Sequence, residues 1–306
     1  MRVRRRRQGG ATVVEESFLF YPHVTFSGAE SVVTIDTGIL TYTLYRPLTV
    51  AWAYTPTGNT YHVAKTGNNA NAGTSGSPWL TILHAISQVV AGDCVYVHAG
   101  DYVEGDLSIT QSGTSGNPII FSCAPGDLGK VKVRTLRSYG LTSNNGDGVF
   151  TVRSAAQHIW INGFVIQGVR AQSPGAYANY AENGVCFQNG GGPSCRVTNC
   201  ISYDNLHSGF KELGHGGTGI LFQGNIGMDN GVNSLDHGIY VPSNNHTIDG
   251  NIFFGNTGYG IHSYDQPAGQ TIIRNLSFNN AYGMVLGGSF CNVYHNVLAY
   301  NLNFGL

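Results

Sequence analysis

The sequence is poor in charge and has no long hydrophobic run. Only 11% of its 306 residues are charged, and five of the 16 basic ones lie in Arg2–Arg7, which leaves the rest of the chain mildly acidic. An acidic body is not expected to track nucleic-acid phosphates, and a membrane helix needs about 18 or more consecutive apolar residues. The sequence therefore predicts neither a nucleic-acid partner nor insertion into a membrane.

Cysteines are few and carry no recognisable pairing motif. The six of them include no C-x-x-C pair and are too sparse for a disulfide scaffold. We expect most of them to be buried thiols. One bridge among Cys186, Cys195 and Cys200 remains an open alternative.

The N-terminal part differs from the rest. We predict a basic disordered tail over residues 1–10, a β-rich leader over 11–60 with strands near Ser31–Ile35 and Ile39–Tyr45, and one large domain over 61–306. Residues Ala11–Phe20 do not form a signal peptide, because Glu15 and Glu16 interrupt the apolar segment.

Glycine and repeated asparagines dominate the second half of the chain. There are 43 glycines, and segments of the type G-N-I-x-x-x-N recur. Their first asparagines are separated by 26, 26, 24 and 21 residues, and they are Asn199, Asn225, Asn251, Asn275 and Asn296. A period in the low to middle twenties corresponds to one turn of a solenoid.

The content of each repeat indicates which solenoid forms. Short β-branched and aromatic segments alternate with Asn and Gly, leaving no room for helices, so we predict a single parallel β-helix of roughly nine coils stacked about 4.8 Å apart. Asn and Gly would supply the left-handed corners. We interpret a second asparagine set as turn residues, which could also form an internal amide ladder: Asn205, Asn230, Asn256, Asn280 and Asn301.

Both ends of a solenoid have to be covered. The segment Pro78–Val90 predicts an N-terminal capping helix, stopped by Gly92, whose apolar stripe is Leu80, Leu83, Ile86 and Val90. The other end reaches Leu306 in mid-repeat. We interpret the chain as truncated there, or as capped by a partner, which would allow a homo-oligomer through this open end.

The stretch Tyr61–Glu104, with Y-H-V-A-K-T-G-N-N-A-N-A-G and A-G-D-C-V-Y-V-H-A-G-D-Y-V-E, resembles the cap and first coil of right-handed parallel β-helix proteins of the pectate-lyase-like superfamily. The repeats D-H-G-I-Y-V and G-Y-G-I-H-S extend the resemblance to Leu306. It implies an all-β fold but leaves the chemistry open, because that superfamily holds lyases, hydrolases, epimerases and virion tailspikes. Asn69 stands where relatives often have Asp.

Stacked coils bring residues at equal offsets into vertical columns. Counted from Gly184, Gly209, Gly238, Gly260 and Gly283, the next residue is always apolar and is expected to face inward. Two residues after the glycine, the outward column contains Lys211, Tyr240 and His262. Two residues before it, a second outward column contains Glu182, His207 and Asp236.

These residue types suit acidic sugars. Elimination or epimerisation at a uronate needs a base and a proton donor, and we assign catalysis to Lys211 as base, Tyr240 or His262 as donor, and Asp236 as the residue that orients them. Glu182, His207, His237 and Tyr264 are assigned to substrate binding, with a hydrogen-bonded core histidine as the alternative for His237. The resemblance supports a lysine base, as in some pectate lyases, whereas Asp236-His237-Gly238 departs from the aspartate-proline-histidine-glutamate run of alginate epimerases.

The resulting hypothesis is a carbohydrate-active protein, with a polysaccharide lyase favoured, that binds an anionic polysaccharide at an extracellular or cell-surface location. The alternatives are an epimerase or a hydrolase on the same fold, and a non-catalytic structural or adhesive β-helix, for which a virion location is open. No cofactor or metal site is assigned. Calcium stays an alternative through Asp204 and Asp229, although two carboxylates make a weak oxygen cage.

Overall fold

The computed structural model describes residues 55–104, 107–135, 147–153, 155–168, 183–188, 192–214, 217–265 and 267–303, and the backbone of three short strands between residues 23 and 45. The chain divides into two compact units, Met1–Ala53 and Tyr54–Leu306. The arginine run, Glu182 and the last three residues lie outside the described part.

The first unit contains a three-stranded antiparallel sheet. Its order is β1-β2-β3, with β1 at His23–Ser27, β2 at Val32–Asp36 and β3 at Thr41–Tyr45. The sequence predicted β2 and β3 but not β1.

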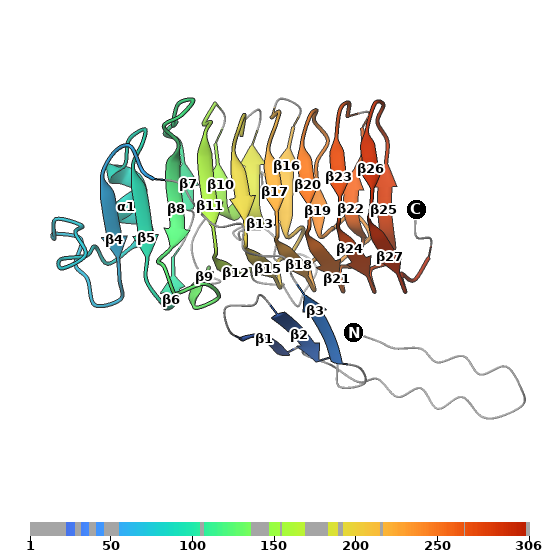
Figure 1. Cartoon of the computed structure of the whole chain (residues 1–306), viewed down its shortest axis with the longest axis horizontal. Helices are drawn as coiled ribbons and strands as arrows, with labels where there is room; N and C mark the ends of the chain where they lie inside the picture. The colour runs from blue at the N-terminus through green and yellow to red at the C-terminus, as the bar shows by residue number, and fades with distance from the viewer. Residues whose placement is uncertain are drawn as a thin grey trace, which may run out of the picture. The chain divides into compact units, whose positions relative to one another are not determined.

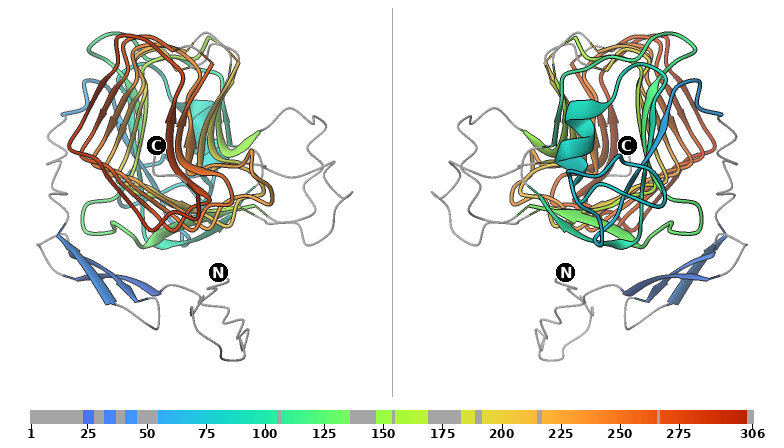
Figure 2. Two further views of the ribbon diagram at one scale, coloured as in Figure 1. Left: turned by 90° about the vertical axis from the view of Figure 1, so that its right-hand side faces the viewer. Right: turned by 90° about the vertical axis from the view of Figure 1, so that its left-hand side faces the viewer.

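The second unit is the predicted right-handed parallel β-helix, in which each coil adds one strand to each of three parallel sheets (Figures 1 and 2). The seven-stranded sheet contains β7 (Leu107–Ile109), β10 (Gly148–Val152), β13 (Asn183–Gln188), β16 (Phe210–Leu213), β19 (Ile239–Tyr240), β22 (Tyr259–Ser263) and β25 (Tyr282–Leu286). The nine-stranded sheet contains β4 (Thr60–Val63), β5 (Cys94–Val97), β8 (Ile119–Cys123), β11 (Ile159–Asn162), β14 (Arg196–Thr198), β17 (Leu221–Gln223), β20 (Thr247–Asp249), β23 (Thr271–Ile273) and β26 (Asn292–Tyr294). The eight-stranded sheet contains β6 (Gly100–Val103), β9 (Val131–Arg134), β12 (Val165–Gln167), β15 (Ile201–Tyr203), β18 (Ile226–Met228), β21 (Ile252–Phe254), β24 (Leu276–Phe278) and β27 (Val297–Ala299).

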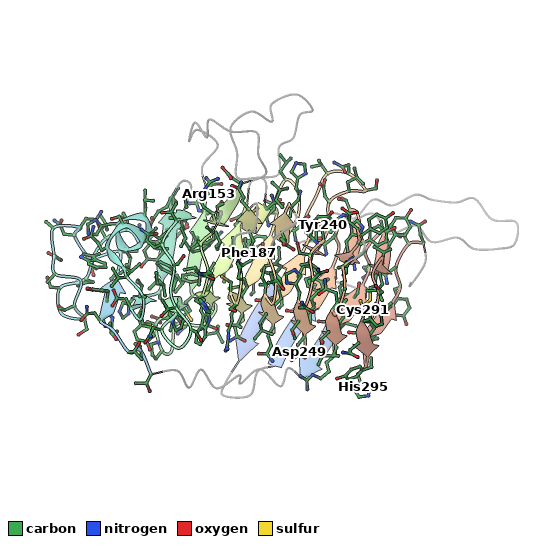
Figure 3. The ribbon with its side chains drawn as sticks, turned by 90° about the horizontal axis from the view of Figure 1, so that it is seen from above. Arg153, Phe187, Tyr240, Asp249, Cys291 and His295 are labelled. Carbon is green, nitrogen blue, oxygen red and sulfur yellow. The ribbon has the colours of Figure 1, made fainter. Side chains whose placement is uncertain are left out.

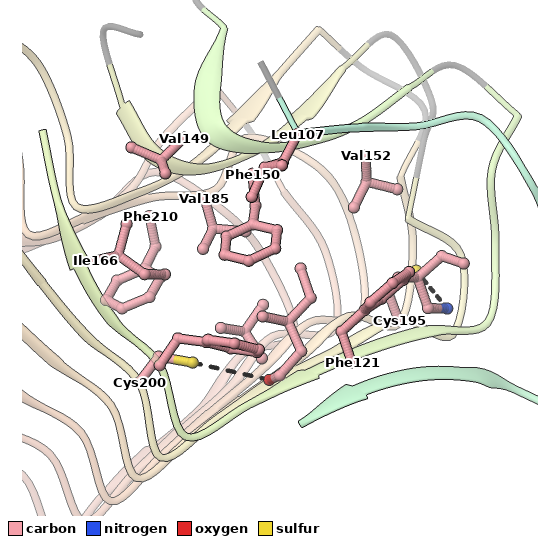
Figure 4. Close-up of a cluster of buried hydrophobic side chains, with 14 of the residues drawn as sticks. Leu107, Phe121, Val149, Phe150, Val152, Ile166, Val185, Cys195, Cys200 and Phe210 are labelled. Atoms are coloured by element: carbon pink, nitrogen blue, oxygen red, sulfur yellow. Dashed lines mark hydrogen bonds between the residues drawn. The ribbon is translucent and has the colours of Figure 1, made fainter. Parts of the chain in front are cut away.

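Side chains from the three sheets meet in one core. Phe150 and Phe210 of the seven-stranded sheet are fully buried with Phe121 of the nine-stranded sheet and Ile166 of the eight-stranded sheet (Figure 4). Each such side chain contributes about 1.5–3 kcal/mol by leaving water. Cys123, Cys195 and Cys200 belong to this core, Cys94 and Cys186 are buried outside it, and Cys291 is partly exposed. All six cysteines are free, so the bridge left open by the sequence does not form.

Two ladders of buried asparagine amides connect the coils. In the first, Nδ2 of Asn225 donates to Oδ1 of Asn251 at 3.0 Å, and Asn251 donates to Asn275 at 3.0 Å. In the second, Asn205 donates to Asn230 at 2.7 Å, and the series continues to Asn301. The second ladder is the one that the sequence indicated.

The corners themselves are formed by the residues before the ladder asparagines. Gly224, Gly250, Asp204 and Asp229 have φ values of 66°, 62°, 56° and 50°, in the left-handed region. Asn199, which the sequence counted as the first asparagine of its repeat, is such a corner residue with φ 55°, and the amide of Cys200 donates to Asn225 instead. The repeat from Asn199 to Asn225 was therefore aligned one residue too long.

The capping helix α1 runs over Ile82–Gln88 and lies across the N-terminal end of the coils (Figure 2). Thr81 caps it, and the carboxylate of Glu104 accepts the amides of Ile82 and Leu83 at 2.9 and 2.8 Å. The predicted stripe is confirmed at Ile86, which is buried with Ile82, Ala85 and Val89. It was wrong at Leu83 and Val90, which are 48% and 62% exposed. Asn69 anchors this turn by accepting the amides of Leu80 and Thr81.

Candidate active site on the seven-stranded sheet

Lys211, Tyr240 and His262 lie on three successive strands of the seven-stranded sheet. Lys211 pairs with Tyr240, and Tyr240 pairs with His262, in the parallel register. The residues preceding them, Phe210, Ile239 and Ile261, are fully buried, whereas the three column residues are partly exposed. The predicted column is confirmed. Figure 3 shows Tyr240 on a different side of the solenoid from Asp249, which belongs to the nine-stranded sheet.

The strand alternation is broken at the recurring glycine. A Cβ on Gly260 would lie 2.0 Å from Oγ of Ser277, which is fully buried, so this position faces the interior as the next residue does. Val149, at the equivalent position of β10, is fully buried. Two consecutive inward positions shift the alternation, and the residue before the glycine then faces outward.

This shift accounts for two residues that the sequence analysis did not assign and corrects one that it did. Tyr259 and Tyr282 are partly exposed, and their rings stack at 4.6 Å. Asp236, expected on an outward column, is only 2% exposed, and His207 of the same column is partly exposed. The missing side chain at each recurring glycine was the one sequence signal that could have indicated that the preceding tyrosine faces outward.

A pair of histidines lies at the centre of the site. His237 is 3% exposed, and its Nε2 lies 2.6 Å from Nδ1 of His262. Its other nitrogen, Nδ1, accepts the backbone amide of Tyr259 at 3.1 Å. Burial lowers the pKa of His237 to about 2 and that of His262 to about 4, so both rings are neutral near pH 7.

Aromatic rings surround this pair. His262 stacks on Tyr259 at 4.8 Å and lies 5.1 Å from the ring of Tyr240 and 5.5 Å from that of Tyr264, which is 53% exposed. Burial raises the pKa of the Tyr240 phenol, with Asp265 and Glu212 adding to the effect, so the phenol keeps its proton. The cluster offers flat apolar faces beside protonated donors.

The carboxylates near the column are already bonded to protein groups. Asp236 pairs with Nδ1 of His207 at 2.5 Å rather than with the column residues that it was expected to orient. Glu212, fully buried, accepts from Nε2 of His246 at 3.0 Å and from two backbone amides. Glu182 lies outside the described residues.

The alternative calcium site would use two carboxylates at corners of the solenoid. Asp204 and Asp229 occupy left-handed corners of successive coils, and Oδ2 of Asp204 lies 3.5 Å from Nε2 of Gln167. Within the described ranges, no group of three or more His, Cys, Asp or Glu side chains is arranged to hold a metal ion. In the same ranges, α1 is the only helix, and its seven residues are too few to cross a bilayer.

Comparisons with known proteins establish the fold. No family model matches the chain. A segment of 64 residues, 21% of the chain, is 38% identical to the uncharacterized protein YwoF of Bacillus subtilis (strain 168) and covers 14% of that protein.

Two solved structures are similar over most of the chain. XylC in complex with xylose has a TM-score of 0.53 at 15% identity, over 79% of this chain and 66% of that one. A rhamnogalacturonan lyase has a TM-score of 0.51 at 19% identity, over 76% of this chain and 62% of that one. The chain therefore spans less than two thirds of the lyase, and what these likenesses establish is the fold, a right-handed parallel β-helix.

Proposed function

We propose that the protein binds an anionic, uronate-containing polysaccharide along the outer face of the seven-stranded sheet and cleaves it by β-elimination. The observation that carries this proposal is the column of Lys211, Tyr240 and His262, three hydrogen-bond donors on successive coils. A spacing of about 4.8 Å between coils matches the reach of one sugar residue and its carboxylate. Polymers of this kind lie outside cells, so the proposal includes an extracellular or cell-surface location.

Each member of the column is suited to an oxygen-rich, negatively charged ligand. Among the described residues, Lys211 has no carboxylate within ion-pair distance, so its charge is available to a ligand. Tyr240 keeps its phenolic proton, and His262 is neutral with one N–H. We assign stacking on sugar faces to the rings of Tyr264 and Tyr282, whereas Tyr259 already stacks on His262 and Tyr282.

In the proposed reaction, the Lys211 ammonium first releases a proton to solvent, and the resulting amine removes the proton at C5, alpha to the uronate carboxylate. The electron pair forms the C4–C5 double bond as the C4–O bond to the next sugar breaks, and the leaving oxygen takes the phenolic proton of Tyr240. Tyr240 is preferred over His262 as donor because the neutral imidazole is a weak acid. Asp236 and His207 hold the neighbouring loop, and Glu182 keeps its predicted role in substrate binding.

Hydrolysis is less well supported. A glycosidase needs two carboxyl groups roughly 5–9.5 Å apart around the scissile bond. Asp236 is bonded to His207 and two amides, and Glu212 is fully buried against His246. Neither carboxylate faces the outer surface.

The test is a screen of the purified protein on pectate, alginate and glycosaminoglycans, with and without calcium, for ultraviolet absorbance of the C4–C5 double bond. Lys211→Ala should abolish the product, and Lys132→Ala, a partly exposed lysine on the eight-stranded sheet, should not. Unchanged release by Lys211→Ala would refute the base assignment. Solvent deuterium uptake without cleavage would indicate an epimerase, and binding without either reaction would indicate the structural or adhesive alternative.

A further inference from the structure

We infer that His237 is a positioning residue that locks His262 as a neutral imidazole, with its lone pair turned to His237 and its Nε2–H available to the ligand. The histidine pair then adds a hydrogen-bond donor of fixed polarity to the site, so the ligand atom beside His262 must be an acceptor oxygen. The ligand part of this inference rests on the proposed function, whereas the state of the two rings does not.

A backbone amide sets the direction of the hydrogen bonds. The N–H of Tyr259 can only donate, so Nδ1 of His237, 3.1 Å away, must carry a lone pair. Neutral His237 then carries its proton on Nε2. That proton points to Nδ1 of His262 at 2.6 Å, which must therefore be the acceptor. Neutral His262 is left with its proton on Nε2.

The same bond blocks protonation of His262. An imidazole with its proton on Nε2 can gain a second proton only at Nδ1, the nitrogen that accepts from His237. Protonation would place two N–H groups against each other at 2.6 Å and break the bond. His262 can therefore change its charge only by separating from His237, so it cannot serve as a proton shuttle while the pair is intact.

The surroundings reinforce this state. His237 is 3% exposed, and the charged groups that act on it are Asp236, which favours its cation, and Lys211, which opposes it. The other titratable groups around the two rings are Tyr240, Tyr259 and Tyr264. Burial, then His262 and then Lys211 act against a charge on His237, and the pair stays neutral.

Nitrogen-15 NMR of the whole chain tests the inference directly. In the wild-type protein, the His262 signals should show the Nε2–H tautomer and stay unchanged from pH 8 to pH 5, while exposed His295 provides a comparison signal in the same spectrum. An Nδ1–H tautomer, or a titration of His262 near pH 6.5, would overturn the inference. This measurement needs no ligand and no variant.

Two variants separate positioning from simple packing. His237→Gln places an amide donor near the Nε2 position and should keep His262 neutral. His237→Phe keeps the ring but removes the donor, and the midpoint of His262 should rise toward about 6.5. If His237→Phe does not fold, the wild-type spectrum and His237→Gln decide the question. Titration of His262 in the folded Gln variant at the same midpoint as in the Phe variant would contradict the role of the donor.

Binding of a uronate oligosaccharide provides the functional readout. When the pH is lowered from 7 to 5, the affinity of the His237→Phe variant should increase by up to about tenfold more than the affinity of the wild type. The reason is that His262 can become a cation in this variant but not in the wild type. If the wild type and His237→Phe both bind and their affinities change equally with pH, the inference that His262 donates to the ligand is refuted. If no uronate binds while the spectra are as expected, the proposed function fails and the assignment of the histidine pair stands.

Discussion

Nδ1 of His207 lies 2.5 Å from Oδ1 of Asp236, 29 positions later in the sequence. The other oxygen of Asp236 accepts the amides of Val232 and Asn233 at 2.9 Å each. Burial alone would raise the pKa of Asp236, but His207 and these two amides outweigh it and hold the pKa below its usual value. An ionised, buried carboxylate therefore ties the loop before β19 to the preceding coil.

Asp236→Asn should lower the free energy of unfolding by about 1.5–3 kcal/mol, because it replaces charge-assisted hydrogen bonds in a buried site. Asp101→Asn is the matched control, since Asp101 pairs with Arg134 at 2.9 Å on the surface. An exposed ion pair contributes only about 0–1 kcal/mol. Urea denaturation of both variants measures the difference in the free energy of unfolding. Equal decreases in the two variants would show that the buried pair stabilises the protein no more than the exposed pair does.

The protein should lose stability on mild acidification. The folded-state pKa of His262, about 4, lies below the ordinary 6.5, so the unfolded chain binds its proton first as the pH falls. The free energy of unfolding should decrease between pH 6.5 and pH 4, with a contribution from His262 on the order of 1–2 kcal/mol once solvent screening of this partly exposed ring is included. Across this window, the melting temperature should depend less on pH in His262→Gln than in the wild type. His295→Gln, which alters an exposed side chain, should show the same pH dependence as the wild type.

Removing one rung should weaken the first asparagine ladder. Oδ1 of Asn251 accepts both the backbone amide and the side-chain amide of Asn225, at 2.8 and 3.0 Å. Asn251→Ala leaves these buried donors unpaired and should cost about 2–5 kcal/mol. Chemical denaturation should show little change for Asn303→Ala, an exposed asparagine with one side-chain bond to Ala281.

Tyr240→Phe should slow the proposed elimination by about 10²–10⁴-fold while leaving oligosaccharide affinity within a small factor, because it removes the proton and keeps the ring. Tyr294→Phe, on the nine-stranded sheet and 50% exposed, is the control. Single-turnover rates and calorimetric binding separate the two effects. A Tyr240→Phe protein with full activity would assign the donor to another group.

The repeat period allowed much of the architecture to be predicted before any coordinates. Aligned glycines and asparagines were sufficient for the β-helix and the column of Lys211, Tyr240 and His262, because parallel stacking turns equal sequence offsets into neighbours. The amide ladder was predicted only as an alternative to turn residues. The helix stripe at α1 was misassigned because Leu83 and Val90 fit a 3.6-residue period as well as the residues that are buried.

Whether the side chains near each recurring glycine point to the core or to solvent depended on the tertiary structure. Strict alternation predicted an outward Asp236, yet the close approach of Gly260 to Ser277 shows that two consecutive positions near the glycine point inward. Likewise, no sequence pattern indicates that the Tyr259 amide fixes the proton of His237, since that depends on a contact between neighbouring coils. The sequence by itself determined the coil and its register, a property of periodicity. Only the packed structure decided which polar groups are buried, which face solvent and which nitrogen holds a proton, because these depend on distances of a few tenths of an ångström between coils.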